Sequence, residues 1–152
     1  GSTKKIHNES ISITKEQLQE FSMLYLIINN FDFFRQNSSI LSNVNFITEE
    51  GIEVSQKLFE LVRSKDEINP NMLPLGKDML EKINKFASVK HISKNIQRDE
   101  SKLNEIFIEM KKDLKKLFLD RQILKLESKF SEDMDQTTLN EIIELKKLQN
   151  NN

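Results

Sequence analysis

DESKLNEIFIEMKKDLKKLFLDRQILKLESKF, residues 99–130, is the stretch that decides the fold of this chain. It contains neither glycine nor proline, the residues that interrupt helices most strongly, so it predicts one continuous helix. At 1.5 Å per residue such a helix is roughly 48 Å long. A compact domain of about 100 residues cannot enclose that length, and we therefore expect the helix to project.

Apolar residues occupy two opposite faces of this helix when they are placed at 100° per residue. The first face comprises Leu103, Ile106, Phe107, Met110, Leu114, Leu117, Phe118 and Leu124. The second is confined to the C-terminal third and comprises Leu119, Ile123, Leu126 and Phe130. Because a helix needs a second apolar face only where it gains a second neighbour, we expect its first two-thirds to pack on a bundle and its end to pair with the last helix.

The segment 131–152 predicts a terminal helix that completes an antiparallel hairpin. The loop SEDMD, residues 131–135, is short, and either Asp133 or Asp135 could cap the helix that follows it. Leu139, Ile142 and Ile143 cluster on one side of that helix and are expected to meet the second face.

Two further leucines of the last helix, Leu145 and Leu148, lie outside this cluster. With the cluster they cover an arc of about 220°, wider than one helix–helix seam requires. They could pack back on Leu117 or Leu124, or stay exposed. Exposed apolar residues that gather on a hairpin usually have a partner.

Upstream, residues 14–98 predict a compact helical subdomain. TKEQ at 14–17 is a capping box that starts a helix apolar nearly all round, ending near Asn29–Asn30. A short packed helix within 31–41 and a helix over Lys77–Phe86 are also expected, whereas 87–98 are ambiguous. Residues 1–13 are expected to be a tag remnant, Gly1–Ser2, and a flexible arm.

Between these elements, Thr48 predicts the N-cap of another helix, with Glu49 and Glu50 in its first turn. The residues expected on the inner side of this helix are Ile52, Leu58, Phe59, Leu61 and Val62. The sequence therefore predicts an all-α protein: a compact helical bundle, a long helix over 99–130, and a C-terminal antiparallel hairpin.

The residue types argue against chemistry within this chain. There is no cysteine, the two histidines stand outside any metal-ligand spacing, and no phosphate-binding or nucleophile motif is present, so we expect no catalytic residue, metal or cofactor. The acidic SEDMD lacks the spacing of a calcium loop and is read as a helix cap. The longest apolar run, Met23–Ile28, is too short to cross a membrane.

Charge argues in the same direction. The formal net charge is −1, which does not favour a nucleic-acid or lipid partner. The lysines of MKKDLKK, residues 110–116, alternate with acids, so a solvated, salt-bridged face is favoured over a weak nucleic-acid patch. We interpret the chain as a protein-binding module.

This arrangement resembles the C-terminal helicase-binding domain of bacterial DnaG-type primases. The stretches that carry the resemblance are EFSMLYLIINNFDFFRQN at 20–37, NFITEEGIEVSQKLFELV at 45–62, and the long-helix and hairpin segment from Leu103 to Gln149. Residues 64–98 carry little of it. The resemblance implies a fragment without catalysis, whose parent would be a DNA-directed RNA polymerase of the bacterial cytoplasm.

In that family the hairpin docks on the N-terminal domains of the hexameric replicative helicase, which ties primer synthesis to unwinding. For this chain the resemblance places partner binding on the last helix, at Ile142, Leu145, Lys146, Lys147 and Leu148. The loop tip, with Phe130 and Met134, is a second candidate; the alternative is that Phe130 closes the seam.

The main rival is the N-terminal domain of the replicative helicase itself, a self-associating helical domain with a related bundle and hairpin. Apolar patterns do not separate the two families. A projecting hairpin is also a natural element for exchange between copies of one chain.

Overall fold

The computed structural model describes residues 13–64, 75–87 and 99–151. Within these ranges the chain is all-α, as expected, with no strand. The expected arm, apart from Ile13, and the ambiguous residues 88–98 lie outside them. The elements are the α-helices α2 (Lys15–Asn29), α3 (Phe31–Gln36), α4 (Glu49–Arg63), α5 (Lys77–Phe86), α7 (Glu100–Asp133) and α8 (Gln136–Asn150), with the 3-10 helix η1 (Ser38–Leu41).

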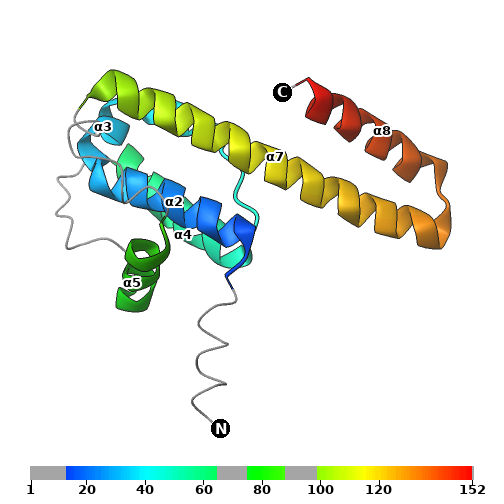
Figure 1. The fold of residues 1–152 in the computed structure, drawn as a ribbon, viewed down its shortest axis with the longest axis horizontal. Coiled ribbons are helices and arrows are strands. Elements are labelled where there is room, and N and C mark those ends of the chain that lie inside the picture. Colours follow the sequence, from blue (N-terminus) through cyan, green and yellow to red (C-terminus); the bar gives the residue numbers. More distant parts are fainter. Residues whose placement is uncertain (1–12, 65–74, 88–98, 152) are drawn as a thin grey trace, which may run out of the picture.

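Helix α2 lies at the centre of the bundle, between α4, α5 and the first half of α7 (Figure 1). The predicted capping box is present: Thr14 Oγ1 accepts the Gln17 N–H at 3.1 Å, and Gln17 Oε1 accepts the Thr14 N–H at 2.9 Å. Its buried apolar residues point in several directions, which confirms a helix enclosed on more than one side. They are Phe21, Met23, Leu24, Leu26 and Ile27.

A buried carboxylate joins α2 to α4. Glu20 is 1% exposed, and its carboxylate accepts hydrogen bonds from the Ile47 and Thr48 N–H groups at 2.6 and 3.1 Å and from the Thr48 hydroxyl at 2.5 Å. Thr48 in turn caps α4 by accepting the Gly51 N–H at 2.9 Å, as predicted. Glu20 therefore fixes the start of α4 against the side of α2.

The inner face of α4 agrees with the prediction only in part, and Phe59 packs against the core as expected. Leu58 and Val62 are buried, but Ile52 is 40% exposed, and the rest of the face consists of Gly51, Val54 and Ser55. The prediction counted large apolar residues only. Two small residues lie on this face because α4 packs close to α2 and to the Glu20 carboxylate, and Ile52 is thereby turned outward.

The first half of α7 packs on the bundle through the first apolar face. Leu103, Phe107 and Leu114 are at most 1% exposed, and the Phe107 ring lies 5.0 Å from the Phe34 ring, edge to face. On the flank, the Lys111 ammonium donates to carbonyl oxygens at the end of η1 and just after it. The helix is continuous over 34 residues, and its C-terminal part runs beyond the bundle (Figure 1).

Candidate functional site: the α7–α8 hairpin

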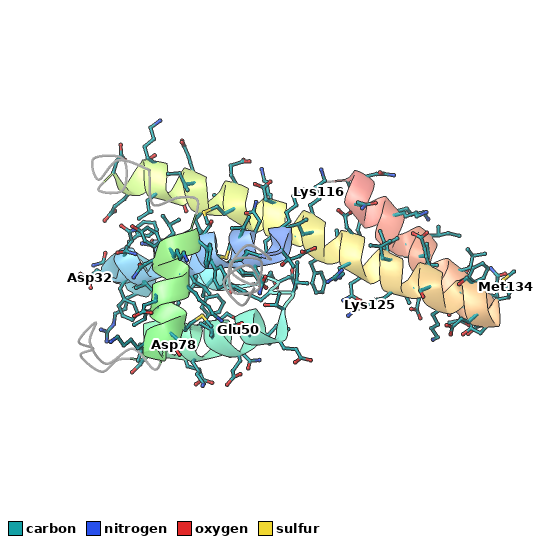
Figure 2. The ribbon with its side chains drawn as sticks, turned by 60° about the horizontal axis from the view of Figure 1, so that its bottom comes forward. Asp32, Glu50, Asp78, Lys116, Lys125 and Met134 are labelled. Carbon is teal, nitrogen blue, oxygen red and sulfur yellow. The ribbon has the colours of Figure 1, made fainter. Side chains whose placement is uncertain are left out.

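The hairpin turns at Met134 and Asp135. Met134 is left-handed, with φ 53°, and its N–H donates to the Phe130 carbonyl at 2.8 Å, which ends α7. Asp135 then caps α8 by accepting the Thr137 N–H at 3.1 Å, so Asp135 rather than Asp133 is the cap. Figure 2 shows Met134 at the free end of the hairpin, far from the bundle.

The seam between the two helices uses the predicted second face of α7. Leu119 and Ile123 are each 5% exposed against Thr138 and Ile142 of α8, at 2% and 5%. At the open end, the Gln149 side-chain amide donates to the Asp120 carboxylate. Helix α8 returns antiparallel toward the middle of α7, on the side opposite the bundle (Figure 1).

One predicted seam residue lies elsewhere. Ile143 was expected in the seam but is 43% exposed, and Leu139 is half-buried. The seam instead follows Thr138, Ile142 and Leu145, at spacings of four and three residues, and ends at Gln149. Two of those positions, Thr138 and Gln149, are polar. A prediction from apolar residues alone therefore places the contact face of α8 too close to Ile143.

The five residues predicted on α8 do not share one environment. Ile142 is buried in the seam, so it holds the hairpin together and does not form part of its outer surface. Leu145 is half-buried, whereas Leu148 is 51% exposed. Lys146 and Lys147 are exposed, and the Lys147 ammonium lies 3.3 Å from a Glu144 carboxylate oxygen.

The two residues predicted at the tip also differ. Phe130 is half-buried at the end of the second face of α7. Met134 is 69% exposed, the highest exposure among the large apolar residues of the described chain. Of the two, Met134 alone presents most of its side chain at the tip.

An apolar groove runs along one side of the hairpin, between α7 and α8. Its volume is about 650 Å³. The residues that line it are Phe118, Gln122 and Leu126 from α7, and Thr137, Asn140, Glu141, Glu144 and Leu145 from α8. Leu145 is a predicted site residue, but the groove is not predicted by the sequence because Phe118 and Leu126 are expected on opposite faces of α7. Both residues line the α7 side of the same groove, eight residues apart along the helix.

A second groove lies where α7 leaves the bundle. Its volume is about 530 Å³, and Ile47 and Thr48 of the bundle face Arg121, Leu124, Lys125 and Ser128 of α7 across it. Leu124 belongs to the first apolar face, expected to pack on the bundle, but it lies beyond the bundle's reach and is 61% exposed. The first apolar face of α7 therefore continues for about two helical turns beyond the end of the bundle.

Two features considered in the sequence, a metal-binding cluster and a salt-bridged face on α7, differ in outcome. No cluster of three or more histidine or carboxylate side chains that could hold a metal ion occurs in the part of the chain described. On α7, Lys112 lies 3.7 Å from Glu109 and Lys102 lies 3.9 Å from Glu105, the pattern expected of a salt-bridged face. Lys111, by contrast, reaches back to η1 and is not part of a solvated row.

Membrane insertion finds no support in the described helices, since none of them combines the length and apolarity needed to cross a bilayer. Comparisons of the chain with known protein families, with curated proteins and with solved structures find no match.

Proposed function

We propose that this chain is a non-catalytic docking domain of a bacterial DNA primase, which attaches to the N-terminal domains of the replicative helicase through the α7–α8 hairpin. The observation that carries the proposal is the unused apolar surface of the hairpin. The seam buries Leu119, Ile123 and Ile142, yet Leu148, Ile143 and Met134 remain 43–69% exposed outside it.

Such exposure is costly in an isolated element. Among the described elements, α8 makes substantial contact with α7 alone. The hairpin therefore has no apolar core beyond the seam between these two helices. Exposed apolar side chains on a projecting element that also carries a groove are typical of a protein-interaction site. The identity of the partner rests on the sequence resemblance to primase domains.

The division of the molecule suits this role. The bundle has its own core, around Phe34, Leu58 and Phe107, and presents the hairpin at the end of a continuous helix. A docking element of this kind needs no chemistry of its own, in keeping with a domain that tethers a primase in the cytoplasm while other domains of the parent synthesise primers.

Binding to the replicative helicase of the same organism, and to its isolated N-terminal domain, tests the proposal by calorimetry. We expect saturable binding that Leu148→Asp weakens at least tenfold, because a buried carboxylate at an apolar contact is strongly unfavourable. Circular dichroism and the melting temperature should stay unchanged, because Leu148 is 51% exposed and lies outside the seam.

Ile108→Asp is the matched control. Ile108 is an apolar residue of α7 with comparable exposure, 41%, but it lies about 18 Å along α7 from Asp120, outside the part that pairs with α8. Its substitution should leave the affinity unchanged. Equal losses in the two variants would contradict docking by the hairpin. No binding to either helicase protein, together with concentration-dependent self-association in sedimentation, would favour the rival helicase N-terminal domain.

A further inference from the structure

The groove between α7 and α8 has one acidic wall and one uncharged wall. On the α8 side it is lined by Glu141 and Glu144, whereas the polar residue on the α7 side is Gln122. We propose that this groove receives a single amphipathic helix of the partner, whose apolar face is bordered along one edge by lysine or arginine. This inference rests on the proposed docking function and specifies the chemistry of the partner.

The floor of the groove fits a short run of helix. Phe118 and Leu126 lie eight residues apart on α7 and are half-buried, and Leu145 faces them from α8. At 1.5 Å per residue the floor is about 12 Å long, slightly more than two helical turns. A partner helix would fill it with apolar residues at positions i, i+3 or i+4, and i+7. A peptide that binds by adding a strand would need an unpaired strand edge, and the described chain has no strand.

Charge on the α8 wall determines which edge of the partner helix faces it. Glu141 and Glu144 are three residues apart and therefore lie on the same side of α8. Glu144 already has Lys147 at 3.3 Å, but among the described residues no basic side chain lies within ion-pair distance of Glu141. A row of basic groups on the partner would meet both carboxylates. An acidic partner would be repelled.

The neighbouring face of α7, next to the bundle, carries the opposite charge. Arg121 and Lys125 line the groove next to the bundle, and Figure 2 shows Lys125 on the part of α7 beyond it. The hairpin therefore has an acidic groove between its helices and a basic one at its base. This polarity distinguishes the two grooves and excludes a basic helix from the second one.

Neutralising the acidic wall tests the inference. The variant is Glu141→Gln with Glu144→Gln, and the control is Glu105→Gln with Glu109→Gln, which changes the net charge equally on the N-terminal half of α7. The control carboxylates are also exposed and lie within 4.0 Å of a lysine, at Lys102 and Lys112. Both variants, in the full chain, are titrated with the helicase N-terminal domain and with a synthetic Leu/Lys amphipathic peptide of about four turns.

We expect the groove variant to bind both probes about five- to tenfold more weakly at low salt, with a shallower salt dependence, and the control variant to bind like the parent chain. A Leu/Glu peptide of the same length should not bind. If the helicase domain binds the groove variant and the parent equally, the inference is wrong while the proposed function stands. If the helicase domain fails to bind but the Leu/Lys peptide binds in the expected order, the groove chemistry stands and the helicase assignment fails. Equal binding of both peptides overturns the inference.

Discussion

Glu20 shows how much of this fold depends on single polar residues. A carboxylate that is 1% exposed is stable only because three donors, two of them backbone N–H groups, surround it. Those donors are at the start of α4, so the residue acts as a second cap across the chain. Thr48 satisfies one orphan N–H of that helix, and Glu20 satisfies two further N–H groups, on Ile47 and Thr48.

Gly51→Ala provides a test of this contact at the residue scale. In an ordinary helix the change would stabilise the protein by up to about 1 kcal/mol. Here a Cβ at position 51 would lie 2.6 Å from Glu20 Oε1, and the carboxylate cannot move without losing its donors. We expect a loss of about 1–3 kcal/mol in the free energy of unfolding, measured in urea.

The Glu20→Ala background serves as the control for that substitution. Glu20→Ala should itself be destabilising, because it leaves buried N–H groups unpaired. Adding Gly51→Ala to it should cost nothing further, since no carboxylate is left to displace. A penalty of equal size in both backgrounds would show that the Cβ meets some other obstacle.

Sequence reasoning succeeded at this scale where the interaction is local. The caps at Thr14 and Thr48 were predictable because their partners lie three residues away. The bond from Ile47 to Glu20 spans 27 residues, and the sequence around Glu20 does not indicate it. The glycine at 51 is explained by the approach of Glu20, whose Oε1 would lie 2.6 Å from an added Cβ.

At the scale of elements, α8 depends on one row of contacts. Ile142→Ala removes the most central of them, 5% exposed against the α7 face of Leu119 and Ile123. We expect a cost of about 2–4 kcal/mol, expressed as local opening of α8, because no other described element supports this helix to any large extent.

Hydrogen exchange followed by mass spectrometry measures this loss helix by helix. Amide protection should fall throughout Gln136–Asn150 and in the last turns of α7, while α2 and α4 keep theirs. The substitution Ile143→Ala, at a residue 43% exposed, should change protection little. A uniform loss of protection over the whole chain would mean that the hairpin and the bundle unfold as one unit.

The contrast between Ile142 and Ile143 shows which property of the helices could not be predicted from the sequence. The range predicted for α5, Lys77–Phe86, is the one observed. The long helix was predicted to end at residue 130, but α7 continues through the first three residues of the expected loop to Asp133, and the short helix expected within 31–41 is divided into α3 and η1. Which side of a helix faces inward was less certain, because Thr138 and Gln149 occupy seam positions that an apolar pattern leaves out. The Gln149–Asp120 bond compensates for the polar end of the row.

At the scale of the whole molecule, α7 is the helix that, among those described, belongs to both the bundle and the hairpin. Its first face was expected to pack on the bundle and its second on the last helix, and both contacts are present. The sequence predicted this arrangement because two opposed faces on one helix require two neighbours. It could not predict the grooves, which depend on how far the bundle and α8 extend along α7.

Lys116→Pro tests whether the continuity of α7 between the bundle and the hairpin matters for binding. Lys116 is exposed and lies between the bundle contacts and the seam (Figure 2). Proline there removes one backbone hydrogen bond and kinks the helix, at a cost of about 3 kcal/mol. We expect a change in the angle between bundle and hairpin, visible in small-angle scattering, and weaker helicase binding at nearly unchanged helical content.

The comparison for that variant is Lys116→Ala, which removes the same side chain without breaking the helix. It should match the parent in scattering and in affinity. If both variants lose binding equally, the Lys116 ammonium contacts the partner and the direction of the hairpin is not what matters.

The continuity of α7 also has a mechanical consequence. The stretch from Leu114, its last deeply buried bundle contact, to Asp133 is about 28 Å long at 1.5 Å per residue. It acts as a lever arm, so a pivot of only 10° at its base would sweep the tip through about 5 Å, close to one helical pitch. Slight adjustments in the packing of α7 on the bundle are thus magnified at the tip, and a load applied there is returned to the bundle as torque.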